Sequence, residues 1–179
     1  MGQKWASKIQ LGRETTAGTA VAATAIWRGA GGAIQDDRAV EMVEELIGIA
    51  MPTNRSYIGQ LGASLSMAET PATFEQIVHI LEAGIKSVGS GASDGVGSGK
   101  VYSYPVGMSS ANSIKTYTIE TGDNQQAEEM EFAFVESFTL SGERGQPVML
   151  SADWIGRQVS ATSFTGALAV PTVEDIIAG

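Results

Sequence analysis

The sequence predicts a mainly β protein, an antiparallel β-sandwich or half-open barrel with one flanking α-helix. Residues 115–157 alternate apolar and polar side chains over three segments joined by turns, which is typical of an antiparallel meander. Only residues 71–84 combine a helical apolar stripe with start and stop signals. The 22 glycines supply the many turns that short strands need.

Composition limits the possible functions. A chain of 179 residues suits one domain with a sizeable core, and the absence of cysteine excludes disulfides and thiol chemistry. The formal net charge of -9 argues against an electrostatic grip on nucleic acid, because Lys and Arg provide that grip. No apolar run approaches the roughly 20 residues of a membrane span, so we expect no membrane partner.

The meander contains three expected strands. The first covers 115–120 and the third covers 148–155. Glu136 interrupts the second strand, which a bulge, a strand end or a contact with another subunit would explain; a bulge is the commonest of these. We expect one face of the second strand to carry its large apolar residues: Met130, Phe132, Phe134, Phe138 and Leu140.

The first half of the chain is less regular. Residues 1–35, rich in Gly, Ala and Thr, are expected to form an extended N-terminal arm with apolar anchors at Trp5, Ile9 and Leu11. Residues 36–50 carry apolar side chains at helical spacing, so the local pattern indicates an amphipathic helix. Residues 56–67 alternate as a strand whose polar face lies outside or lines a solvent-filled space.

The helix at 71–84 is expected to begin with Thr70 as N-cap and Pro71 at the first helical position. His79 is the only histidine, and Glu75 and Glu82 lie at helical spacing from it. Such acids more often form a solvated face than a metal site, so we expect no chemistry there. Residues 84–99, rich in Gly and Ser, are expected to be a mobile loop, and 161–179 a C-terminal arm.

Enzymatic function is not expected. A serine hydrolase needs a nucleophile, a base and an acid together, but the single histidine lies on a helix with no nucleophile elbow nearby. The acids at 128–131 are typical of a charged strand surface, and spacing alone does not identify a glycosidase pair. We predict no catalytic residue, no cofactor and no metal ligand.

Several segments together resemble one known family, the tail tube (major tail) proteins of long-tailed bacteriophages. The resemblance rests on Lys-Thr-Tyr-Thr-Ile-Glu at 115–120, the segment 132–140 and Val-Met-Leu-Ser-Ala-Asp-Trp-Ile-Gly at 148–156. Residues 14–20 and the stretch from 55 to 86 agree with it, so it covers most of the chain. Similar proteins often continue past a segment like Pro-Thr-Val-Glu at 171–174, so we expect a short or truncated form.

The resemblance implies a structural subunit of a tail tube. Its strands would join those of neighbours in stacked hexameric rings that form the conduit for DNA ejection. Implied partners are a tape measure protein in the lumen and tail terminator and tail tip proteins at the ends, with DNA passing without specific binding. The implied location is the virion tail, with assembly in the host cytoplasm. The tube of a contractile injection or type VI secretion system is the alternative, and a carbohydrate-binding β-sandwich is a more distant one.

The resemblance also changes how ambiguous segments are interpreted. It favours a strand rather than a helix at 36–50 and implies a tail-tube β domain that spans residues 36–160. It also implies that the N-terminal anchors Trp5, Ile9 and Leu11 pack on a neighbouring ring. A conduit must not hold DNA, so small polar and acidic side chains suit its wall. The lumen-lining candidates on polar strand faces are Glu41, Glu44, Gln60, Ser64, Ser66, Glu129 and Glu131.

Overall fold

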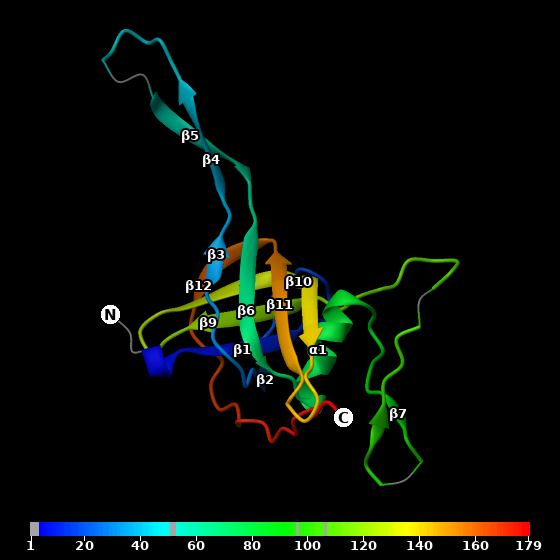
Figure 1. The fold of residues 1–179 in the computed structure, drawn as a ribbon. Helices are drawn as coiled ribbons and strands as arrows, with labels where there is room; N and C mark the ends of the chain where they lie inside the picture. The colour runs from blue at the N-terminus through cyan, green and yellow to red at the C-terminus, as the bar shows by residue number, and fades with distance from the viewer. Residues whose placement is uncertain (1–3, 51–52, 96, 106) are drawn as a thin grey trace.

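A computed structural model shows a β-structured body from which two hairpins project (Figure 1). The structure describes residues 4–50, 53–95, 97–105 and 107–179. Within them, one antiparallel sheet runs in the order β2-β1-β9-β10-β11-β6-β3, and β12 pairs with β10 beside this path. The fold class is therefore confirmed as mainly β with one α-helix. The strands of the body are β1 (Lys8–Arg13), β2 (Ala25–Ile26), β3 (Ile34–Asp36), β6 (Ala63–Pro71), β9 (Tyr117–Gly122), β10 (Ala127–Ser141), β11 (Met149–Gly156) and β12 (Gln158–Thr162).

The long strand β10 belongs to both halves of the body. Its first part pairs with β9 and β12, and its second part, from Phe134 on, pairs with β11. We call β2-β1-β9-β10-β12 the first sheet and β10-β11-β6-β3 the second sheet. The register shifts between Met130 and Ala133, where Phe132 has a φ of 56°. This irregularity lets one strand turn from one sheet into the other.

A second irregularity in β10 confirms the expected bulge at Glu136. Val135 pairs with Trp154 and Ser137 pairs with Asp153, so Glu136 is the extra residue. The expected apolar face of β10 was only partly right, because the two irregularities change the alternation. Met130 is buried and Phe138 packs against the core as expected, but the other core residues of this strand are Ala133 and Val135, and Phe132 is 36% exposed.

The core lies between the two sheets and the helix. Its largest fully buried side chains include Trp154, Tyr117 and Leu11. The rings of Tyr117 and Trp154 meet edge to face with centroids 5.7 Å apart. The remaining large members come from both sheets and the helix: Leu65, Ile80, Ile119, Met130 and Leu150.

The helix α1 (Phe74–Gly84) begins three residues later than the expected 71–84. Thr70 and Pro71 are extended in β6, where they pair with Leu150 and Met149. Since the sheet holds this segment, Thr73 becomes the N-cap, with φ -121° and ψ 151°. Glu82, expected on a solvated face, is buried in the helix.

Among the described residues 4–35, the chain does not form a separate arm beyond the body. β1 pairs with β9 over its whole length and with β2 on its other side. Ile9 and Leu11 are buried in the core of their own subunit, so they do not project from a free arm as anchors. The short helix η1 (Lys4–Ala6) precedes β1, and Trp5 on it is 89% exposed.

Residues 39–44 of the segment 36–50 form a strand and not a helix, as the strand interpretation predicted. β4 (Ala39–Glu44) pairs with β5 (Thr53–Gln60) to form the first projecting hairpin. The single strand expected at 56–67 is instead two strands, β5 and β6, which Leu61 and Gly62 separate. A second, short hairpin of β7 (Ala92–Ser93) and β8 (Lys100–Val101) occupies the glycine-rich region.

The C-terminal segment runs over its own body. Thr73 forms an isolated bridge with Asp175, and Pro147 forms one with Ile177. The amide of Val148 donates to the carbonyl of Ile176 at 2.7 Å. Thr165 fixes the start of this segment, because its amide donates to the Glu120 carboxylate at 2.8 Å.

Candidate functional site

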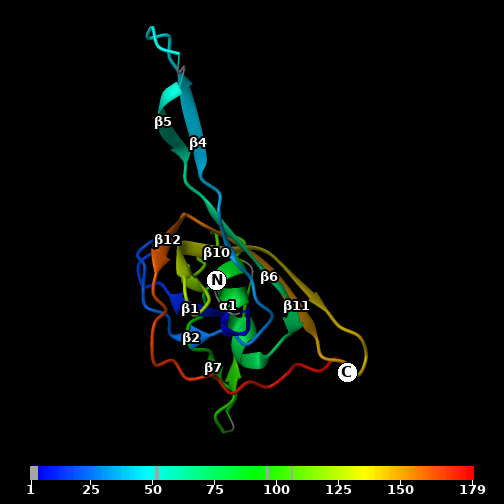
Figure 2. The same ribbon diagram turned by 90° about the vertical axis from the view of Figure 1, so that its left-hand side faces the viewer.

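The β4–β5 hairpin leaves the body (Figures 1 and 2). One of its faces is apolar and exposed. Val40 and Met42 lie on one face with Ile58, the register partner of Val40. Glu41 and Arg55 lie on the opposite face. The three apolar residues are 52%, 72% and 51% exposed. Since an isolated two-stranded ribbon is at best marginally stable in water, this face is suited to burial against another molecule.

The tip of the hairpin is also apolar. Leu46 is 97% exposed, Ile47 52% and Ile49 58%. Behind them, Arg55 Nε lies 2.8 Å from Glu45 Oε1 and ties the two arms of the hairpin together. Three exposed branched side chains at the end of a projection form a contact surface rather than a core.

The outer face of the second sheet carries a polar row. Ser66, Asp153 and Ser137 are direct neighbours on β6, β11 and β10. Both serine hydroxyls donate to the Asp153 carboxylate, Ser66 to Oδ1 and Ser137 to Oδ2, the latter at 2.9 Å. These two hydrogen bonds, that from Ser66 first, hold the pKa of Asp153 below its ordinary value. The row therefore presents an ionised carboxylate between two hydroxyls.

The structure does not bring the seven lumen candidates together. Glu41, Glu44 and Gln60 lie on the hairpin, and Ser64 and Ser66 lie on the polar face of β6. The remaining two lie in the first part of β10: Glu129 and Glu131.

Glu129 and Glu131 are half-buried and engaged within the subunit. Glu131 forms an ion pair with Arg157 and accepts a hydrogen bond from Gln158 Nε2 at 2.7 Å. Burial, and next to it the neighbouring carboxylate of Glu120, raises the pKa of Glu129. These two acids hold the first sheet together and are less accessible than the Asp153 row.

Sequence reasoning missed Asp153 and Ser137. The alternation in 148–155 does place Asp153 on the face opposite Trp154. Its pairing with Ser66, however, depends on the register between β11 and β6, whose members are 87 positions apart.

Residues 5–178 match the model of the phage tail tube protein family, nearly the whole chain. The chain belongs to the phage tail tube proteins. Among curated proteins there is no match to the sequence. The family places this tail tube protein in the virion tail, as a structural subunit that assembles with copies of itself into a tube.

A network of four polar side chains connects the helix of the tail tube protein to the first sheet. The guanidinium of Arg13 donates to the buried Glu82 carboxylate, and Tyr117 Oη donates to Glu82 Oε2 at 3.1 Å. His79 Nδ1 lies 3.1 Å from Tyr117 Oη and, since that hydroxyl donates to Glu82, supplies the proton of this contact. Burial, and next to it the charge of Arg13, lowers the pKa of His79 to about 4.

This network of side chains borders a cavity of about 670 Å³ between α1 and the second hairpin. Its wall includes His79, Glu82, Lys100 and Tyr102. A histidine with a pKa near 4 is a poor general base at neutral pH, because the best proton acceptors titrate near the working pH. The network of Arg13, Glu82, Tyr117 and His79 therefore has a structural role: it holds α1, β1 and β9 together.

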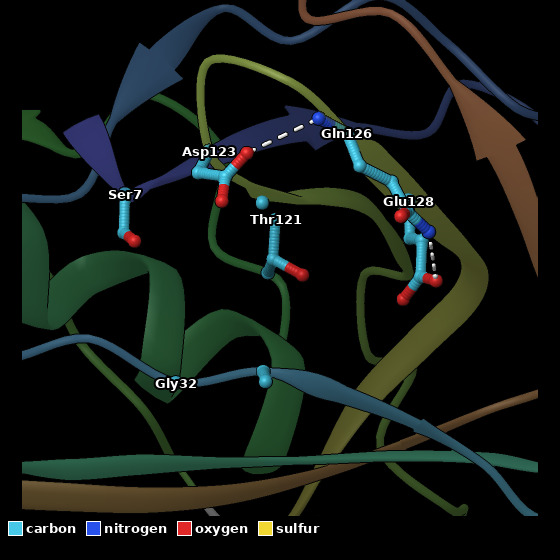
Figure 3. Close-up of a pocket in the computed structure, with 8 residues that line it drawn as sticks. Ser7, Gly32, Thr121, Asp123, Gln126 and Glu128 are labelled. Atoms are coloured by element: carbon cyan, nitrogen blue, oxygen red, sulfur yellow. Dashed lines mark hydrogen bonds between the residues drawn. The ribbon is translucent and has the colours of Figure 1, made fainter. Parts of the chain in front are cut away.

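A smaller hollow of about 260 Å³ opens beside the β9–β10 turn (Figure 3). Gly32 faces it from one side, while Asp123 and Gln126 lie on the other, where the backbone N–H of Gln126 donates to Asp123 Oδ1 at 3.1 Å. Within the described residues, no three His, Asp or Glu side chains are placed to hold a metal ion. No helix in that part of the chain is long and apolar enough to cross a membrane.

Proposed function

We propose that the chain assembles into stacked hexameric rings whose lumen conducts phage DNA into the host. The observation that carries the proposal is the β4–β5 hairpin, whose apolar face and tip have no partner in the described part of the subunit. Burying Val40, Met42 and Ile58 against a second copy removes apolar surface from water, which stabilises association by about 25 cal/mol per Å² before the cost of ordering. A tube subunit needs such a surface.

The open strand edges of the body support joining of subunits within a ring. Beyond Ala133, β10 pairs with β11 on one edge, and its other edge has no strand partner among the described residues. β3 at the far end of the second sheet pairs only with β6 there. Pairing such edges between neighbours removes exposed backbone groups, as closure of a barrel does.

The polar face of the second sheet is the surface we assign to the lumen, together with Glu41, Glu44 and Gln60 of the hairpin. Ser64 and Ser66 stand beside the ionised Asp153 on this face. Acidic groups repel phosphates at short range, while salt screens them beyond about 8 to 10 Å. Such a wall lets DNA pass without counterion-releasing contacts to Lys or Arg. A tape measure protein would fill the lumen before ejection, and terminator and tip proteins would close the ends of a tube that assembles in the host cytoplasm.

Assembly is tested by Met42→Asp, because a buried carboxylate would oppose docking of the hairpin. We expect a folded monomer that no longer forms tubes in electron micrographs. Met108→Asp is the matched control, since Met108 is 99% exposed in another loop. Normal hexameric tubes from Met42→Asp would contradict the proposal, as would rings of another symmetry from the unmodified protein.

Conduction is tested separately with Glu41→Lys combined with Glu44→Lys in particles whose tubes still form. We expect slower DNA ejection, more so at low salt, because added lysines bind phosphates and salt weakens that binding. Glu143→Lys combined with Glu174→Lys, at two exposed positions outside the hairpin, changes the total charge by the same amount and is the control. Unchanged ejection at every salt concentration would remove these two residues from the lumen.

A further inference from the structure

A groove beside β1 and β2 has the features of a receptor for the hairpin tip. The hollow is about 440 Å³ in volume and has an apolar floor of Ile9, Ile26 and Trp27. Gly29, Gly31 and Gly32 form a wall without side chains. Ser7 and Gly32 also border the hollow of Figure 3, so the two hollows are neighbours.

Two polar groups of this groove, Trp27 Nε1 and the Lys8 ammonium, could each take a further partner. Trp27 is 6% exposed, and its Nε1 has no hydrogen-bond partner among the described residues. Buried indole N–H groups usually find an acceptor, and the backbone carbonyl of an inserted segment would supply one. Lys8 lies over the Phe164 ring at 4.2 Å from its centroid and has no carboxylate partner within the described chain.

The charges of the groove favour one orientation of an acidic ligand. Lys8 lines the apolar hollow, whereas Asp123 and Glu128 line the neighbouring one. An acidic segment is therefore attracted to the apolar hollow and repelled from the other.

The hairpin tip matches these requirements. It carries the exposed Leu46, Ile47 and Ile49, and Glu44 and Glu45 precede them. Residues 39–60 carry three carboxylates, Glu41, Glu44 and Glu45, and one cation that pairs with Glu45, Arg55. The tip is thus apolar at its end and acidic along its stem, which complements an apolar floor beside Lys8.

The positions of tip and groove suit an assembly that grows in one direction. The hairpin leaves the body at the end opposite β2 in both views (Figures 1 and 2). A contact that joins two different patches of identical copies is heterologous, so it can repeat from copy to copy. We infer that the tip of one subunit, Leu46 to Ile49, seats in the groove of a second copy, beneath Gly31 and against Trp27. This inference rests on the proposed self-assembly and adds the receptor for the hairpin.

The absence of cysteine makes a direct test possible with a single pair of introduced thiols. Gly31→Cys and Ile47→Cys, combined in one full-length chain, should form disulfides between copies under mild oxidation, because a seated tip brings the two Cα atoms within the roughly 7 Å that a disulfide tolerates. A side chain at Gly31 meets no atom within 4 Å, so the substitution is tolerated by the subunit. We expect a ladder of covalent oligomers on a non-reducing gel. Mixing the two single-cysteine variants should give covalent dimers and nothing longer.

Gly166 offers the matched control, since a side chain there also meets no atom within 4 Å and it lies outside the groove. Gly166→Cys with Ile47→Cys should give no ladder, and Gly31→Phe should abolish pelletable tubes while Gly166→Phe retains them. If the unmodified protein forms tubes and the 31–47 pair does not crosslink in them, the groove is not the receptor, although self-assembly stands. If the unmodified protein forms no tubes, both the proposed function and this inference fall.

Discussion

The carboxylate of Glu14 accepts a hydrogen bond from the backbone amide of Phe132, 118 positions away, at 2.8 Å. Phe132 is the residue with positive φ at which β10 leaves the first sheet for the second. The same carboxylate accepts hydrogen bonds from Gly18 N and from the hydroxyls of Thr116 and Thr118. One buried acid thus holds the loop after β1 and the turning point of β10 in place.

Glu14→Gln should destabilise the subunit. The side-chain amide of the introduced glutamine keeps one acceptor oxygen, but its NH₂ group is a donor and cannot accept the hydrogen bonds that the second carboxylate oxygen accepted. Each buried donor left unpaired costs about 1 to 3 kcal/mol. We expect a loss of this order or more in the free energy of unfolding, measured by urea denaturation. Glu143→Gln, in an exposed turn, should leave stability unchanged, and equal stability of both variants would contradict the assigned role.

His79 should make the subunit less stable as pH falls. Its pKa is lowered from 6.5 to about 4 in the folded state, so between these values the unfolded chain binds more protons. The stability from neutral His79 is therefore complete above about pH 6.5 and is lost as pH falls toward 4. At about 1.4 kcal/mol per pKa unit the loss amounts to about 3 kcal/mol.

The measurement is the difference in unfolding free energy between the unmodified protein and His79→Gln from pH 4 to 7. Taking the difference cancels the titration of carboxylates that both proteins share. The charged groups of the surrounding chain, Arg13 and Glu82, are unchanged in the variant. A difference that stays constant over this range would show that His79 is not held neutral.

The polar row of the second sheet gives a prediction about a single carboxyl group. Hydrogen bonds from Ser66 and Ser137 lower the pKa of Asp153. Ser66→Ala combined with Ser137→Ala should return that pKa toward its ordinary value, as followed by NMR titration of the Asp153 carboxyl carbon. Asp153 is exposed, so the global stability should change little. If the pKa is the same in both proteins, the row does not stabilise the charge.

The sequence predicted those elements whose pattern is local. Alternation revealed the strands around Ile119 and Trp154, and the acid at Glu136 revealed a bulge. For β1 the local pattern is misleading, because the glycines and alanines around Ile9 and Leu11 are typical of an extended terminus. Its partner strand is more than 100 positions away, at Ile119, and no local rule specifies such a pairing.

The candidate site shows the same limit. A strand at 36–50 predicts that Glu41 and Glu44 lie on a polar face, and alternation predicts the same for Ser66. Glu82 was placed on a solvated face because its helical spacing gives no sign of Arg13 and Tyr117, which bury and satisfy it. Buried polar groups that depend on distant partners are invisible to periodicity.

Of the three residues predicted to anchor the N-terminal segment on a neighbouring ring, Trp5 alone is exposed. Its contribution to assembly can be measured separately from the contribution of β1 to folding. Trp5→Ala should leave the free energy of unfolding within about 0.5 kcal/mol of the unmodified protein, because the side chain is 89% exposed. Leu11→Ala, at a residue that is 1% exposed, should cost about 2 to 5 kcal/mol and serves as the contrast. Trp is among the residues that contribute most to protein interfaces, so Trp5→Ala should nevertheless slow tube growth, followed by light scattering. Growth at the unmodified rate would show that the exposed indole does not contact a neighbouring ring.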